Sequence, residues 1–547
     1  MLKRVGVLLG LISIATSPWT TYDPINPLKF LLLGICGSSC LAFVIMHRNR
    51  IQLNRILVLA SLMFVLQALI SALFSESNFT QDFYGSYGRY FGLFTWIMLF
   101  AIMVCMSLFE DFTYLLRVFL IVGCISLIYS IIQYAGRDPA PWNNEFNSIL
   151  GFLGNPNFQS SFLGLFLVAL FGTILMKLRS RVHVLFLSLA AVASALLILS
   201  SNSIQGIFVG AVGIASFGMY YLFAKKLYKT FWLLFTSGLA TFALFILSVI
   251  AFGPLTLFPS KGTLAIRGDY WRAAFSMAKD HLLTGVGPDQ FGTWYRFYRH
   301  QEALTRINAE VVTDSAHNGY LDFAANLGVI ALIAYLALLV YATMQIGRFI
   351  KRQDSIDLTH ATIVALFLGF QAQFLISPNQ IGLVIWGWAF LGAIFGYASV
   401  PDKKMGQIAN LKKSFKRFPK SELNFSVMAS VLIGTVLGLI FTGPVVYSSM
   451  QFRDALVKAD AIKVISAVNI WPRKEELVIY SVGLLVSNNL EEQGSKLVDS
   501  GLREFPNSFD LWRQKLSFKY LTESEKKEIQ AQLHRLDPLN PEWAPKN

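Results

Sequence analysis

Long apolar runs of 18 to 25 residues recur along most of the chain, separated by short charged connectors. Each run is long enough to cross roughly 30 Å of hydrocarbon as an α-helix. A transmembrane β-barrel would instead show shorter segments of alternating polarity. The pattern predicts an all-α, polytopic membrane protein of about 12–13 transmembrane helices. We place these spans at residues 4–20, 28–46, 54–74, 91–108, 113–135, 157–177, 182–200, 203–223, 230–253, 317–346, 358–376, 381–399 and 425–447.

Two polar segments interrupt this pattern. The connector 254–316 is far longer than the others, and its Trp and Gly-rich turn suggest helices lying on the membrane surface. After a transmembrane domain at 1–449, residues 450–547 form a soluble tail. There "WPRKEEL" (471–477) recurs as "FPNSFDL" (505–511) and, more weakly, as "DPLNPEW" (537–543). Pro472, Pro506 and Pro538 are 34 and 32 residues apart, near the tetratricopeptide period, which predicts a small helical repeat domain able to bind a protein partner.

The net charge of +14 indicates topology and gives no evidence for a nucleic-acid site. Lys and Arg gather in alternate connectors, and the positive-inside rule assigns these connectors to the cytoplasm. The N-terminus is then cytoplasmic, whereas the loops 75–90, 136–156 and 254–316 and the tail are extracytoplasmic. The basic connectors are 47–50, 177–181, 224–229, 347–352 and 402–420.

The first residues, "MLKRVGVLLGLISIATSPW", are open to two interpretations. They resemble a signal peptide, but an uncleaved first helix is favoured because the remaining topology then obeys the charge rule throughout. The four cysteines lie in apolar stretches without a CxxC pair. They predict inert thiols with no metal site and no cofactor; they are Cys36, Cys40, Cys105 and Cys124.

The segment "DSAHNGYLDF" (314–323) places polar residues where an apolar run begins. Asp314 or Ser315 could cap the helix by accepting hydrogen bonds from its first free amides. Capping does not explain His317, Asn318 and Asp322, since a lipid-facing surface there should be apolar. The segment therefore predicts polar side chains that face a water-filled cavity.

Arginines in the outer loops are further candidates. Arg267 in "IRGDYW", four residues before Trp271, offers a planar charged fork suited to phosphate oxygens, but anchoring to lipid headgroups explains it equally well. Arg89 in "GSYGRYFG" has the same two interpretations. A solvated loop surface accounts for the dispersed residues Arg296, Arg299, His300 and Arg306.

Two polar turns complete the set. Asn155 in "GNPNF" (154–158) precedes a proline and is a natural helix start. Gln205 closes the turn "SSNSIQG" (200–206) and could reach a cavity, although a polar turn at an interface needs no further reason.

Taken together, these segments resemble the O-antigen ligase superfamily, which also includes O-antigen polymerases and bacterial protein O-oligosaccharyltransferases. The resemblance runs in the family's order from about residue 84 to 335. It rests on "GSYGRYFG", "GNPNF", the turn ending in Gln205, "RGDYW…GVGPDQF" and "AHNGYLDFAANLG".

The resemblance implies a GT-C-like, inverting, metal-independent glycosyltransferase of polysaccharide biosynthesis in the bacterial cytoplasmic membrane. The donor would be a glycan on undecaprenyl diphosphate, and the acceptor a hydroxyl on a lipid, a glycan or a protein. The family's essential outer-loop Arg and helix-opening His match Arg267 and His317. A second essential Arg corresponds to Gln205, a departure that leaves the phosphate-binding set incomplete unless Arg89 compensates.

Within that resemblance, Arg267 would stabilise the leaving diphosphate. His317 would be either a general base, oriented by Asn318 or Asp314, or a cationic phosphate ligand. The alternative function is a membrane transporter of a small solute or anion. A transporter should carry ionisable residues near the bilayer midplane or inverted repeats, and neither is seen in the sequence. A non-catalytic scaffold is a third reading, which the polar cluster at 314–322 disfavours.

Overall fold

The computed structural model describes residues 1–49, 51–109, 111–142, 147–176, 180–249, 263–306, 308–399 and 420–545. Within these ranges the regular elements are all helices, which confirms the predicted class. The elements are α1 (Leu2–Ile14), α2 (Asn26–His47), α3 (Arg55–Phe74), α4 (Phe79–Tyr84), α5 (Leu93–Met106), α6 (Thr113–Tyr134), η1 (Gly151–Leu153), α7 (Pro156–Leu175), α8 (Arg181–Ser200), α9 (Ile204–Ala224), α10 (Tyr228–Val249), α11 (Thr263–Asp280), α12 (Phe291–Tyr298), α13 (Gln301–Arg306), α14 (Gly319–Leu327), α15 (Val329–Arg352), α16 (Leu358–Ile376), α17 (Ile381–Ala398), α18 (Lys420–Val457), α19 (Ala461–Val468), α20 (Glu475–Ser487), α21 (Glu491–Glu504), α22 (Phe509–Leu516) and α23 (Glu523–Leu536).

Ten of the described helices are long and apolar enough to cross a membrane. The shorter helices α1 and α5, together with α10, occupy the other three predicted positions. Apolar side chains cover the outside of the bundle, with Leu59 66%, Leu189 56% and Leu432 66% exposed. In water such a surface would be unfavourable, so these helices face lipid, and the chain is a multi-pass membrane protein.

The prediction of one span over 317–346 is wrong in detail, because Gly328 divides it into α14 and α15. Gly328 has φ +83°, and a Cβ there would lie 2.4 Å from the Leu283 carbonyl oxygen. The Val329 amide donates to the Leu282 carbonyl at 2.9 Å. The outer loop therefore docks on the break, and α14 remains a short helix at the outer end of the bundle.

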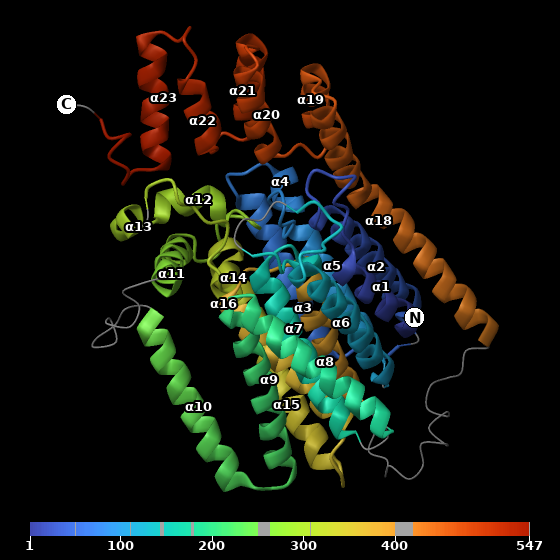
Figure 1. The fold of residues 1–547 in the computed structure, drawn as a ribbon. Helices are drawn as coiled ribbons and strands as arrows, with labels where there is room; N and C mark the ends of the chain where they lie inside the picture. Colours follow the sequence, from blue (N-terminus) through green and yellow to red (C-terminus); the bar gives the residue numbers. More distant parts are fainter. Residues whose placement is uncertain are drawn as a thin grey trace.

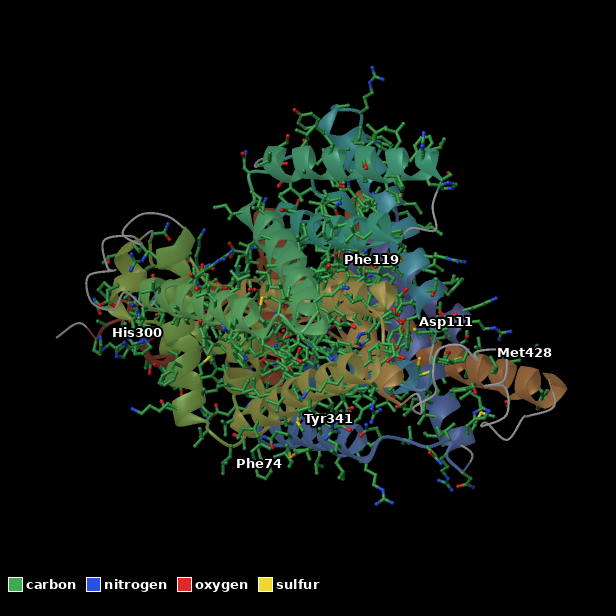
Figure 2. All side chains as sticks on the ribbon, turned by 90° about the horizontal axis from the view of Figure 1, so that it is seen from below. Phe74, Asp111, Phe119, His300, Tyr341 and Met428 are labelled. Carbon is green, nitrogen blue, oxygen red and sulfur yellow. The ribbon has the colours of Figure 1, made fainter. Side chains whose placement is uncertain are left out.

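The centre of the bundle is α17, whose apolar window is 94% buried, with α16 and α7 around it. Small residues allow these helices to approach closely, as at Gly164 of α7, where a Cβ would lie 2.5 Å from the Gly206 carbonyl oxygen of α9. Helix α18 packs along α2 at one edge. Viewed from below, Met428 of α18 and His300 of the outer loop lie on opposite sides of the bundle (Figure 2).

The tail begins without a break, since α18 is 38 residues long and continues out of the bundle towards α19. Figure 1 shows α19–α23 at the same end as α4, α12 and α13. The two stronger copies of the predicted repeat, at 471–477 and 505–511, lie at the starts of α20 and α22. These helices pack against α21 and α23 respectively. A helical tail is confirmed, and its identity as tetratricopeptide repeats stays a prediction.

The tail is docked on the outer loop through a buried ion pair. Arg299 and Asp537 both have fully buried side chains; Nε of the arginine lies 3.2 Å from Oδ1 and Nη2 lies 2.5 Å from Oδ2. Arg296 lies 3.6 Å from the same carboxylate. The expectation of a solvated surface for Arg296 and Arg299 is wrong, because a tail distant in sequence covers both residues.

We expect Asp537→Ala to destabilise the protein by about 3–5 kcal/mol, because it leaves the Arg299 charge buried without its partner. Thermal unfolding followed by tryptophan fluorescence in detergent would measure the change. Asp454→Ala is the matched control, since it removes a 2.8 Å ion pair with Lys458 in which both side chains are about half exposed. Equal melting temperatures for the two variants would show that the Arg299–Asp537 pair does not hold the tail.

Candidate functional site

Helices α11 and α12 fold over the outer end of α14 and enclose a small apolar core. Its buried members include Tyr270, Met277, Phe291 and Ala316. Trp271 belongs to this core as well, with its indole Nε1 buried and unpartnered, so it packs the loop from within. The core fixes α11 against the start of α14 and brings Arg267 and His317 to the same region.

His317 lies between this core and the first turn of α14. Its φ of +53° is a rare backbone conformation for a residue with a side chain. The imidazole packs against the Tyr270 ring at 5.4 Å between centroids. Neither ring nitrogen has a hydrogen-bond partner among the described residues, so both are available to a ligand.

Burial lowers the pKa of His317 to about 4; Asp314 opposes the shift, and the cations Arg267 and Arg89 add to it. At neutral pH the imidazole is therefore uncharged and carries a free lone pair. A strained, half-buried and uncharged histidine with no hydrogen-bond partner among the described residues is typical of a functional residue.

Arg267 differs from the other outer-loop arginines because it has no acidic partner in the described structure. Arg272 and Arg306 both pair with Asp269, the latter at 2.6 Å. Arg296 and Arg299 pair with Asp537, as described above. The Arg267 guanidinium is partly buried, and burial lowers its pKa. A desolvated, uncompensated guanidinium attracts an anion strongly.

Arg89 has the opposite character, since two carboxylates compensate it. Its Nε donates to Asp289 Oδ1 at 3.0 Å and its Nη1 to Asp314 Oδ1 at 3.1 Å. Although burial opposes it, the carboxylates of Asp314 and Asp289 hold the pKa of Arg89 above its ordinary value. Arg89 therefore joins three segments of the outer surface: the 85–92 loop, the turn at 284–291 and the approach to α14.

Asp289 is the centre of this junction. Its φ is +63°, and its Oδ2 accepts from the amides of Ser86 at 2.9 Å and Phe91 at 3.1 Å. Gly85 must be a glycine here, because a Cβ would lie 2.6 Å from Asp289 Oδ2. Only the motif order of the resemblance pointed to "GVGPDQF", and nothing in the spacing identified its Asp as buried.

Asn318 is the residue that caps α14. Its Oδ1 accepts from the amides of Tyr320 at 3.1 Å and Leu321 at 3.2 Å. The expectation that Asp314 or Ser315 would cap is wrong, because the helix begins only at Gly319. Neither Asn318 nor Asp314 hydrogen-bonds the His317 ring, so Asp314 influences that ring only through its charge.

A small cavity of about 20 Å³ lies behind Arg89 and is lined also by Asp289, Asp322, Asn326 and Asn379. It has room for one water molecule. Asp322 Oδ1 accepts from the Ala316 amide at 2.8 Å, and Oδ2 has no partner among the described residues. Burial raises the pKa of Asp322 to about 7. The polar positions of the first turn thus divide into a helix cap at Asn318 and a cavity wall at Asp322.

The other two candidates belong to a second polar group, at the starts of α7 and α9. Asn155 caps α7 by accepting from the Asn157 amide at 2.8 Å. Gln205 is buried, and its Oε1 accepts from Ser161 at 3.3 Å. In the described structure neither hydrogen-bonds Arg267 or His317. His, Cys, Asp and Glu side chains form no group of three or more suited to a metal ion in the described ranges.

We expect Arg89→Ala to destabilise the protein by about 3–5 kcal/mol, because Asp289, with its side chain 3% exposed, loses its cation. Asp314→Asn should have a small effect, because that side chain is 58% exposed. Thermal unfolding of both variants measures the loss of stability in each. A fully stable Arg89→Ala variant that had lost only ligand affinity would instead make Arg89 a ligand-binding residue.

We expect histidine NMR to report His317 as neutral from about pH 7.5 to pH 5, whereas an ordinary histidine titrates near 6.5. The lowered pKa means that the unfolded state binds more protons between about pH 6.5 and pH 4. This residue therefore weakens the fold as the pH falls through that window. The His317→Ala spectrum assigns the resonance, and a midpoint near 6.5 would contradict the prediction.

Comparison with known proteins finds a family that matches part of the chain. Residues 157–336 match the family described as O-antigen ligase. The matched interval begins in α7, ends in α15, covers about a third of the chain and contains both Arg267 and His317. None of the curated proteins matches the chain. Residues 157–336 match an O-antigen ligase domain, which supports the predicted resemblance to the O-antigen ligase superfamily and points to a glycosyltransferase-type enzyme that acts on lipid-linked glycans.

Proposed function

We propose that the protein transfers a glycan from undecaprenyl diphosphate to an acceptor hydroxyl at the outer face of the bacterial cytoplasmic membrane. The observation that carries the proposal is the pairing of an uncompensated arginine with an uncharged, unpartnered histidine inside the matched domain. Arg267 supplies a positive charge for a phosphate, and His317 supplies a free lone pair for a proton.

The reaction breaks the bond between the anomeric carbon and the diphosphate oxygen and forms a bond from that carbon to the acceptor oxygen. The acceptor's proton passes to His317, and undecaprenyl diphosphate leaves with an additional negative charge. Arg267 stabilises that charge as it develops. A single displacement of this kind inverts the anomeric configuration and needs only these side chains as catalytic groups.

The electrostatics favour His317 as a base over His317 as a cationic phosphate ligand. In the free protein its imidazole is uncharged at neutral pH, because burial lowers its pKa to about 4. A bound diphosphate would place negative charge beside the ring and raise this pKa towards the working pH. A base whose pKa rises when the donor binds becomes more effective when it is needed.

The arrangement of the loops supports an extracytoplasmic site. The outer loop, the 85–92 loop and the tail contact one another at one end of the bundle, and the basic connectors predict that the opposite end faces the cytoplasm. The soluble tail beside the site favours a large acceptor or a protein partner over a simple polymerase.

We expect His317→Ala to lower turnover by about 10²–10⁴-fold through loss of the base. Arg267→Gln should lower it by about 10²–10³-fold through loss of charge stabilisation. The measurement is release of undecaprenyl diphosphate from a lipid-linked glycan by purified protein, with and without EDTA. Turnover that persists in EDTA would support a metal-independent reaction.

Arg272→Gln is the matched control, since this arginine lies on the same helix but is already paired with Asp269. It should retain most of the turnover, because Arg306 still pairs with Asp269. Equal losses in Arg267→Gln and Arg272→Gln would show that the outer loop had been disturbed as a whole. Full turnover in both His317→Ala and Arg267→Gln would refute the site.

A further inference from the structure

A second and much larger cavity lies where residues 18–25, residues 141–142, residues 150–157 and the start of the tail meet. Its volume is about 660 Å³, within the range typical of small-molecule sites. Most of its lining lies outside the O-antigen ligase domain. The lining includes Tyr22, Trp142, Asn155, Asn157 and Arg453.

Two aromatic walls of this cavity are held rigidly. Trp142 donates its indole Nε1–H to the Tyr129 hydroxyl at 2.7 Å. Tyr22 packs against Phe452 of α18, with 4.9 Å between ring centroids, and against Tyr480 of the tail at 5.6 Å. Rigid aromatic surfaces bind the apolar C–H face of a sugar ring at little entropic cost.

A cation and two amides supply the polar wall. Arg453 donates its Nε–H to the Trp19 carbonyl at 2.9 Å, which orients the guanidinium, and it has no acidic partner in the described structure. The side-chain carbonyl of Asn155 accepts from the Asn157 amide, and that of Asn157 accepts from Ser203 at 2.8 Å. The side-chain NH₂ groups of both residues have no partner among the described residues.

We propose that this cavity binds a carboxylate-bearing sugar of the glycan substrate, through residues other than Arg267 and His317. Trp142 and Tyr22 would contact the sugar ring, Asn155 and Asn157 its hydroxyls, and Arg453 its carboxylate. The inference rests on the proposed function for the nature of the ligand. The sugar comes from either the donor or the acceptor, since the chemistry of recognition is the same.

The probe for binding is the oligosaccharide released by mild acid from the host's own undecaprenyl diphosphate carriers, compared with the same material after chemical reduction of its carboxylates. Binding to full-length protein in nanodiscs is measured by microscale thermophoresis. We expect the reduced glycan to bind about tenfold more weakly, because it loses a charge-assisted contact with Arg453. Arg453→Gln should abolish this difference, and Trp142→Leu should weaken both glycans.

The controls are Arg348→Gln and Trp232→Ala, which remove exposed residues of α15 and α10 outside the cavity. His317→Ala should bind the free glycan normally, which separates this inference from the proposed reaction. Equal affinity of the two glycans, or unchanged affinity in Arg453→Gln, would overturn the proposal. So would loss of binding in phosphatidylglycerol nanodiscs but not in phosphatidylcholine ones, because the cavity would then hold a lipid headgroup.

Turnover assays identify the source of the sugar. An Arg453→Gln variant with a KM raised about tenfold for the lipid-linked donor assigns the cavity to the donor, and a raised KM for the acceptor assigns it to the acceptor. Unchanged KM values for both substrates would exclude a role of this cavity in the reaction, even if His317 and Arg267 proved essential.

Discussion

The outer surface of this protein depends on the buried cation of Arg89. Its guanidinium joins Asp289 in the outer loop to Asp314 before α14, and each carboxylate comes from a segment some 200 residues away in sequence. Burial of Arg89 or Asp289 would be unfavourable for either charge alone, whereas Asp314 is 58% exposed and adds a weaker attraction. The 85–92 loop and the turn at 284–291 are therefore stable only together, and Arg89 links both to the approach to α14.

The tail is attached to the 85–92 loop, which carries Arg89. Lys474 donates to the Gly85 carbonyl at 2.7 Å, and the amide of Tyr87 donates to Glu476 at 3.1 Å. Burial lowers the pKa of Lys474 to about 8. With Arg299 and Asp537, the tail thus contacts both sides of the candidate site.

The site contains one arginine that is paired with carboxylates and one that is not, and the two have different roles. Arg89 is compensated by carboxylates and gives rigidity, whereas Arg267 is uncompensated and remains available to an anion. A single arginine could not do both, because the carboxylates that fix a guanidinium also neutralise its attraction for phosphate. Arg453, which lines the large cavity, likewise has no acidic partner in the described structure.

The sequence by itself determined the class of protein and the approximate positions of the membrane helices, and its motif order proposed Arg267 and His317 as the leading residues. Hydrophobic length and motif order depend on local sequence, so they can be read directly. Only the tertiary structure showed that Asn318 caps α14, that Gly328 divides the predicted span and that Arg299 is buried. It also distinguished Arg89 from Arg267, which the sequence presents as similar residues. That distinction depends on which carboxylates come within 4 Å of each guanidinium, and only the long-range folding of the chain decides those distances.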